Sequence, residues 1–273
     1  MKSPASNSSA MSCPLPPEIL DFIVDHLHDK QSTLKACRLV SKSWIPRTRK
    51  HLFAYIKFRP TYRPVQSWKR TFPDPSNSPA HHVSTLSLEG IHVSMLTDPG
   101  VGPWIRSFNR VGTLRVTSTF SALDQVSLVQ LHGFSPTLKS LCLRLTNIPL
   151  SEIFNLVCSF PLLEDLELVT YDPTNDINNW DSPSTSPKLT GSLKIGGEIR
   201  FIARGLCDLP GGLHFSKITL TYGEDATSTR DMVSRCSDLE SLKISCRGWG
   251  TSTLVSVIGQ HLTAGYECRH GHV

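Results

Sequence analysis

Metal-binding side chains gather at the C-terminus, where the sequence reads Cys268-x-His270-x-His272. Zinc sites usually need a second cluster at a matching spacing, and none accompanies this tail, so we favour an ordinary polar tail. The segment 171–188 is rich in Asp and Asn, but it lacks the register and the turn glycine of a calcium loop, so we favour turns exposed to solvent. His81, His82 and His92 complete the candidates that we considered. The sequence therefore predicts no metal ligands and no cofactor.

Catalytic motifs are missing from the chain. It contains no G-x-S-x-G, no H-E-x-x-H and no Walker loop. Gly100-Val101-Gly102 runs into Pro103 and lacks the third glycine of a dinucleotide-binding loop. Ser, His and Asp are plentiful, so a triad assembled from distant residues stays open, although nothing points to one. We therefore expect a protein that is not an enzyme.

The positive charge is concentrated in one stretch. The chain has 28 Lys and Arg against 23 Asp and Glu, a net charge of +5. Residues 42–70 contain nine basic residues and no acidic one, whereas residues 71–273 contain fifteen basic and nineteen acidic residues. The basic stretch is interleaved with the aromatic residues Trp44, Phe53, Tyr55, Phe58, Tyr62 and Trp68. This composition could bind single-stranded nucleic acid, but we favour aromatic side chains facing a core, with Lys and Arg on solvated sides.

Nothing in the sequence indicates a membrane protein or an exported protein. No apolar run approaches the roughly 20 residues of a membrane helix, and the sequence MKSPASNSSAMS has no apolar signal-peptide core. The eight cysteines form no C-x-x-C. We expect reduced thiols and a cytoplasmic or nuclear protein.

The sequence predicts a small helical module over residues 13–53, preceded by a disordered tail at residues 1–12. Pro17 suits a first helical turn, and apolar residues follow at helical spacing. A second helix is predicted to begin after Ser32 or Thr33, either of which could cap it. The segment SWIPRTRKHLF supplies a third helix. Three short helices bury little surface, so the module should pack on a partner or on the following domain.

From residue 54 onward, apolar-x-apolar pairs recur about every 26 residues, within the range of leucine-rich repeats. Each pair predicts a short strand with its apolar residues facing inward. The pairs are Ile56/Phe58, Leu86/Leu88, Leu114/Val116, Leu141/Leu143, Leu166/Leu168, Leu193/Ile195, Ile218/Leu220 and Leu242/Ile244. Helices are predicted between them at 64–72, 101–109, 121–132, 151–160, 198–207 and 229–236, with a long loop at 171–188 and a weak helix at 252–262. The predicted fold class is α/β: a three-helix module followed, over residues 54–273, by a curved solenoid of short parallel strands and helices.

The first module resembles an F-box. The resemblance covers residues 13–53 and depends on Leu15-Pro16-Pro17-Glu18, the apolar helix after it, the run Cys37-x-x-Val40-x-x-x-Trp44, and Leu52-Phe53. Ser41 stands where many F-boxes have a second Cys. The amino-acid sequence of this module is similar to those of the large F-box families of mushroom-forming fungi. The later segment resembles the irregular leucine-rich repeats that often follow an F-box. No Asn follows the strands at the usual ladder offset.

The resemblance implies a substrate-receptor subunit of a ubiquitin ligase. An F-box docks on the Skp adaptor and, through it, on a cullin–RING ligase, while the downstream domain holds a protein substrate that the sequence does not identify. Such a receptor raises the effective concentration of substrate near the conjugating enzyme. The candidate adaptor-binding residues are Leu15, Pro16, Ile19, Leu20, Ile23, Leu27, Leu34, Val40 and Trp44. Trp44 could instead be the core residue that holds the helices together.

The repeat region is predicted to supply a second surface, from strand residues that alternate with the inward pairs. This column contains Ser87, Glu89, Thr117, Cys142, Val169, Thr219, Thr221 and Ser245, and the candidate substrate-binding residues Arg115, Arg144, Glu167, Lys194 and Lys243. The alternative is a solvated face, with recognition by the loops. Two other functions stay open: an F-box scaffold without ligase turnover, and a nucleic-acid-binding protein that uses residues 42–70.

Overall fold

The computed structural model describes most of the chain. The described residues are 16–59, 64–90, 102–117, 125–134, 136–171, 173, 180, 186–221, 226–245 and 267–268. The chain divides into two compact units, Met1–Ala54 and Tyr55–Val273, and each is described by itself.

The first unit is helical. Its elements are α1 (Pro17–His26), α2 (Gln31–Val40), the 3-10 turn η1 (Lys42–Trp44) and α3 (Ile45–Leu52). Pro17 occupies the first turn of α1, where its missing N–H costs nothing. The predicted start of α2 is wrong by two or three residues, because the helix begins at Gln31. The backbone N–H of Leu34 donates to the Lys30 carbonyl at 2.9 Å, so Ser32 and Thr33 lie inside the first turn, and no side chain caps the helix.

The interior of this unit is small. Among its described residues, the buried side chains are Val24, Leu34, Cys37 and Thr48. The Thr48 hydroxyl donates to the Trp44 carbonyl at 2.8 Å, so the buried polar group is satisfied within the unit. The helices therefore keep much of their apolar surface on the outside.

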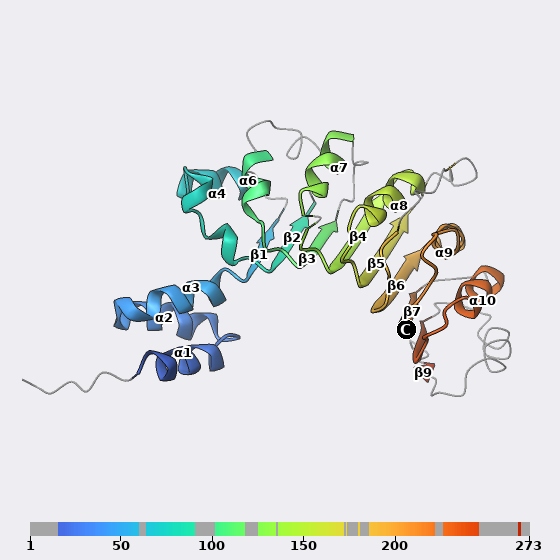
Figure 1. Ribbon diagram of the computed structural model, residues 1–273. Coiled ribbons are helices and arrows are strands. Elements are labelled where there is room, and N and C mark those ends of the chain that lie inside the picture. The colour runs from blue at the N-terminus through green and yellow to red at the C-terminus, as the bar shows by residue number, and fades with distance from the viewer. Residues whose placement is uncertain are drawn as a thin grey trace, which may run out of the picture. The chain divides into compact units, whose positions relative to one another are not determined.

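The second unit contains a parallel sheet in which strand order follows the chain, from β1 to β9 (Figure 1). Its strands are β1 (Tyr55–Phe58), β2 (Thr85–Glu89), β3 (Thr113–Thr117), β4 (Ser140–Thr146), β5 (Asp165–Tyr171), β6 (Ser192–Gly197), β7 (Lys217–Thr221), β8 (Ser241–Ser245) and β9 (Glu267–Cys268). The α/β class and the first eight strands are confirmed. Strand β9, which is only two residues long, was not predicted.

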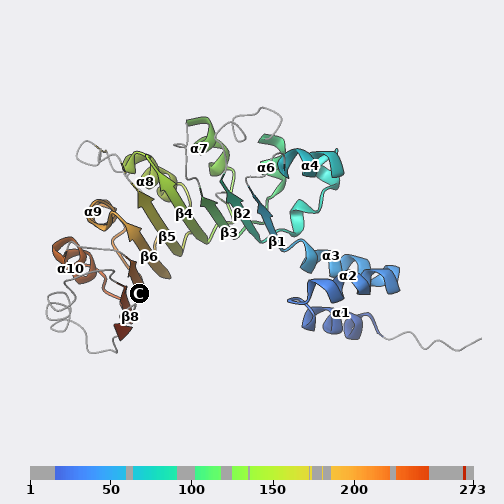
Figure 2. The same ribbon diagram turned by 180° about the vertical axis from the view of Figure 1, so that it is seen from behind.

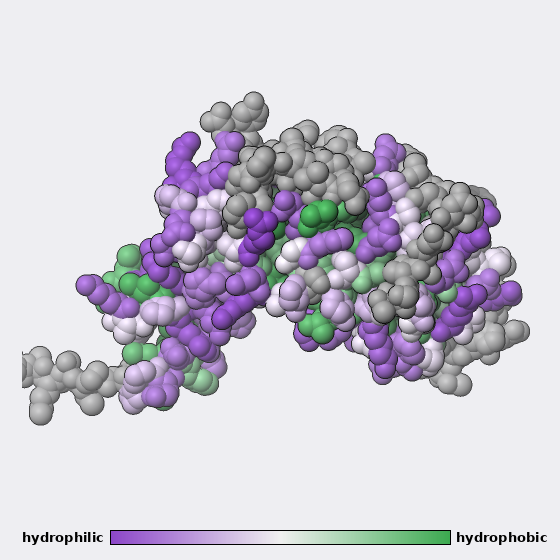
Figure 3. Space-filling view, turned by 45° about the horizontal axis from the view of Figure 1, so that its top comes forward, coloured by the Kyte–Doolittle hydropathy of each residue, from purple (hydrophilic) through white to green (hydrophobic). Residues whose placement is uncertain are grey.

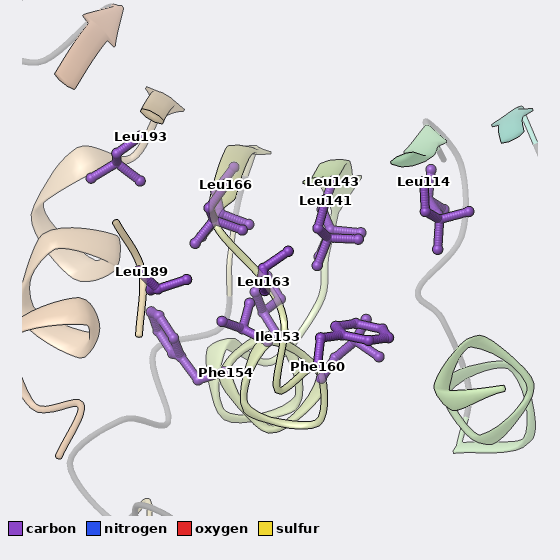
Figure 4. Close-up of a cluster of buried hydrophobic side chains, with 14 of the residues drawn as sticks. Leu114, Leu141, Leu143, Ile153, Phe154, Phe160, Leu163, Leu166, Leu189 and Leu193 are labelled. Atoms are coloured by element: carbon purple, nitrogen blue, oxygen red, sulfur yellow. The ribbon is translucent and has the colours of Figure 1, made fainter. Parts of the chain in front are cut away.

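The register of the sheet matches the apolar pairs. Leu141 pairs with Leu114 on one side and with Leu166 on the other, and Leu166 pairs in turn with Leu193. Figure 4 shows these side chains pointing from the strands toward Ile153, Phe154 and Phe160 beneath them, all fully buried. Successive repeats thus build one continuous core, as in a solenoid.

Among the described residues, helices cover one face of the sheet and leave the other bare (Figures 1 and 2). They are α4 (Pro64–Thr71), α6 (Gly102–Ser107), α7 (Gln125–His132), α8 (Leu150–Cys158), α9 (Ile199–Cys207) and α10 (Ala226–Ser234), with the 3-10 turns η2 (Pro75–Asn77) and η3 (Pro79–His82). Both ends of each of these helices lie within three residues of the predicted ends, with one exception. Helix α7 begins at Gln125, whereas the helix was predicted to begin at residue 121. The two 3-10 turns were not predicted, and the predicted helix at 252–262 lies outside the described residues. We call the bare side the outer face.

The loop predicted at 171–188 is held against the second unit's core at Trp180. Tyr171 belongs to β5, and Trp180 packs against the core. The Trp180 indole N–H donates to Asn155 Oδ1 at 2.9 Å, and its ring lies 5.4 Å from that of Phe154. The loop is therefore attached to α8 at this residue.

Candidate binding surfaces

Helix α1 presents apolar side chains on two faces, and the first unit buries only one of them. Val24 is buried, and Leu20 and Leu27 are partly buried. On the other face, Ile19 is 47% exposed and Phe22 is 62% exposed. These two residues, with Ile23, lie at positions i, i+3 and i+4 and form one apolar stripe.

Helix α2 ends in a second exposed apolar pair. Leu39 is 83% exposed and Val40 is 73% exposed. Hydrophobic side chains interrupt the hydrophilic surface of this unit in Figure 3. We call Ile19, Phe22, Ile23, Leu39 and Val40 together the exposed apolar set. Burial of such a side chain is worth roughly 1.5–3 kcal/mol, so a partner that covers several of them would gain substantial stability.

The candidate adaptor-binding residues separate into outer and inner groups. Pro16, Ile19, Ile23 and Val40 are exposed, while Leu20, Leu27 and Trp44 are partly buried. Leu34 requires a correction: it is fully buried between the helices, so it supports the unit from inside and offers no free surface. Leu15 lies outside the described residues. Phe22 and Leu39 were not predicted as binding residues, although the apolar positions on both faces of α1 could have indicated Phe22.

An ionic cluster joins α1 to α3. Arg47 donates through Nε to Asp25 Oδ1 at 2.6 Å and through Nη2 to Asp25 Oδ2, and His51 Nε2 lies 2.7 Å from Asp25 Oδ1. The hydrogen bonds from Arg47 and then from His51 hold the pKa of Asp25 well below its usual range. The same bond with Asp25 raises the pKa of Arg47. This cluster fixes the helix that carries the exposed apolar stripe.

The outer face carries a second charged group at the centre of the sheet. Arg144 donates to Glu167 Oε1 from Nη2 at 2.6 Å and from Nε at 3.1 Å, and Lys194 Nζ lies 3.2 Å from the same oxygen. Burial alone would raise the pKa of Glu167, but the hydrogen bonds from Arg144 and Lys194 outweigh it and lower the pKa. The structure thus brings three of the five candidate substrate-binding residues together.

The other two candidates, Arg115 and Lys243, lie on the same face. Arg115 is exposed on β3, Lys243 is partly buried on β8, and neither forms an ion pair with any described residue. Lys57 and Glu89, nearer the start of the sheet, form an ion pair of 2.5 Å. The outer face is therefore polar and of mixed charge, as its sequence predicts.

Two residues of the predicted outer column are not available to a partner. Ser87 is 2% exposed and Cys142 is 7% exposed. Burial, and then the nearby Glu167 carboxylate, raise the pKa of the Cys142 thiol. The column thus supplies fewer contact residues than the alternation of the strands predicts.

The aromatic residues of the basic stretch are partly used in packing. Phe58 is buried, and Trp68 packs edge-on against it with ring centroids 6.0 Å apart. Arg47 and Lys57, two of the basic residues, are held by the ion pairs described above. These residues therefore serve the fold, whereas Tyr55 is exposed and Tyr62 lies outside the described residues.

Within the described ranges, no three His, Cys, Asp or Glu side chains come together in a group that could hold a metal ion. The histidines of the tail 269–273, His92 and most of the Asp- and Asn-rich loop lie outside those ranges. In the part of the chain that the structure describes, no helix has the length and apolar character needed to cross a membrane.

No protein-family model matches the chain. No curated protein is significantly similar to it.

Proposed function

We propose that this chain is an F-box substrate receptor of a Skp–cullin–RING ubiquitin ligase. In this proposal the first unit is the F-box that docks on the Skp adaptor. The second unit is an irregular leucine-rich-repeat domain that holds a protein substrate. The chain does no bond chemistry itself and acts by bringing the substrate near the ligase.

The observation that carries the proposal is the exposed apolar set. A unit of three short helices leaves Phe22, Leu39 and Val40 more than half exposed, which is costly unless another surface covers them. These side chains lie on the same helices as the residues that resemble the F-box pattern. Docking on an adaptor would bury them and explain why the unit tolerates so small an interior.

The repeat unit supports the second half of the proposal. Its core runs without interruption from β1 to β8, so the sheet can hold its outer face rigid without help from a partner. A rigid polar face suits a receptor, because binding then needs little ordering of the receptor itself.

Affinity capture of the full chain with the proteasome blocked tests the proposal. The docking variant is Phe22→Ser/Leu39→Ser, which changes only exposed side chains. The control variant is Val129→Ser/Leu162→Ser, which makes the same kind of change at positions of the second unit that are 58% and 50% exposed. We expect the wild type and the control variant to retain the adaptor, the cullin and ubiquitylated proteins, and the docking variant to lose all three.

Each alternative function has its own result in this capture. Retention of the adaptor without ubiquitylated proteins would favour the scaffold that lacks ligase turnover. Absence of the adaptor, with salt-sensitive capture of nucleic acid that survives in the docking variant, would favour the nucleic-acid-binding protein.

A further inference from the structure

The centre of the outer face presents more positive than negative charge. Arg144 and Lys194 share one carboxylate, and their side chains are 49% and 42% exposed, whereas that of Glu167 is only 20% exposed. Arg115, exposed on β3, adds a third cation that no described acidic residue neutralises. The three cations against one carboxylate leave a local net charge of +2. We call Arg115, Arg144 and Lys194 the basic cluster.

The cluster has a definite length. Its members lie on β3, β4 and β6, and adjacent strands are about 4.8 Å apart, so its ends are separated by roughly 14 Å across the sheet. An extended peptide rises about 3.3 Å per residue. A segment of four or five residues would therefore span it.

Apolar surface lies beside the cluster. Val169 is partly buried and Tyr171 is 53% exposed, both on the outward side of β5. Val169 pairs in register with Gly196, and a side chain at Gly196 would approach Val169 to 3.3 Å. The Val169 methyl groups therefore fill the space over Gly196 and stay partly exposed on the outer face.

We propose that the basic cluster and Val169 bind an extended protein segment rich in Asp and Glu with an apolar residue among them. Carboxylates would pair with the outward donors of Arg115, Arg144 and Lys194, and the apolar side chain would cover Val169. A nucleic acid fits less well, because Glu167 stands between the cations and would repel a continuous row of phosphates. The inference rests on the proposed function in one respect: the bound segment is taken to belong to a substrate of the ubiquitin ligase.

A peptide array tests the inference with the full chain. Ten-residue peptides would be graded from carboxylate-rich through neutral to lysine-rich, with phosphoserine-rich peptides and an oligouridine strand as further arms. We expect the carboxylate-rich peptides that contain an apolar residue to bind, and their binding to weaken as salt is raised. Binding independent of peptide charge, or confined to the phosphoserine peptides or to the oligouridine, would overturn the inference.

The matched variants are chosen to keep the sheet intact. Arg115→Glu/Lys194→Gln removes two cations but retains the Arg144–Glu167 pair, and we expect about tenfold or greater loss of affinity for acidic peptides. Arg106→Glu/Arg204→Gln makes the same charge change at exposed positions of α6 and α9 and should bind normally. Equal binding by both variants would contradict the proposed site. All of these variants should still capture the adaptor, so failure of this inference is distinguishable from failure of the proposed function.

Discussion

The Asp25 carboxylate on α1 accepts a hydrogen bond of 2.6 Å from Arg47 Nε on α3, twenty-two residues later in the chain. His51 Nε2 lies 2.7 Å from the same carboxylate oxygen. The contact crosses the first unit and holds the helix that carries Ile19 and Phe22 against the one that leads into the sheet.

Substitution Asp25→Asn should destabilise the first unit by about 1 kcal/mol, a modest value because the carboxylate is partly exposed and solvent screens the pair. The effect should depend on pH. A carboxyl group whose folded-state pKa is lowered stabilises the fold above its unfolded pKa of about 4, and that stability is lost as the pH falls toward the lower folded value. Chemical denaturation at pH 7 and pH 3 should show a smaller difference between wild type and variant at pH 3. An equal difference at the two pH values would contradict this role.

Gly197 is expected to be irreplaceable at the end of β6. Its φ is +81°, and a side chain there would drive Cβ into the Thr170 carbonyl oxygen. Gly197→Ala should therefore cost about 3 kcal/mol or more. Gly112→Ala is the matched control, because its Cβ would meet nothing closer than 3.9 Å. Similar melting temperatures for the two variants would contradict this account of β6.

Thr170 is expected to be replaceable with a gain in stability. Its side chain is 1% exposed, and its hydroxyl finds no hydrogen-bond partner among the described residues. Thr170→Val removes the unsatisfied group at nearly constant volume and should stabilise the second unit by about 1 kcal/mol. Thr48→Val, at a buried threonine whose hydroxyl donates to the Trp44 carbonyl, should give no such gain in the first unit. Denaturation midpoints measure both effects, and a loss of stability in Thr170→Val would show that its hydroxyl is satisfied.

Cys236 should resist alkylation in the folded protein. Burial raises the pKa of its thiol to about 12 and that of Cys158 to about 11, so very little of either thiol is the reactive thiolate at pH 8. Iodoacetamide followed by peptide mass spectrometry should show slow labelling of both residues at pH 8, and rapid labelling once guanidinium unfolds the chain. Rapid labelling of Cys236 before unfolding would contradict its burial.

The sheet could be predicted from the sequence because its cause is local. Alternation around Leu141 and Leu166 places every second side chain on one face, and the repeat length then sets the register between strands. Strand β9 could not be predicted in this way, since Glu267–Cys268 is too short to show a pattern. The hydrogen bond from Trp180 to Asn155 joins a loop to a helix. No periodic pattern of residues indicates a contact of this kind, so it could not be predicted.

The binding surfaces could be predicted only in part. Helical spacing identifies Ile19 and Ile23 as apolar, but it does not tell which side of a two-faced helix the neighbouring helices cover. Leu34 and Phe22 show the consequence: the first is buried and the second is exposed, and only tertiary packing distinguishes them. On the sheet, the positions of Arg144 and Lys194 were predictable, but their sharing of one Glu167 oxygen was not.

Direct titration of the purified full chain with a purified Skp adaptor tests the central claim most directly. Isothermal titration calorimetry should show binding of the wild type and of Val129→Ser/Leu162→Ser with the same Kd. The docking variant Phe22→Ser/Leu39→Ser should bind about tenfold more weakly or worse, because it loses the apolar surface that the adaptor covers. No binding by the wild type, or an unchanged Kd in the docking variant, would contradict the account.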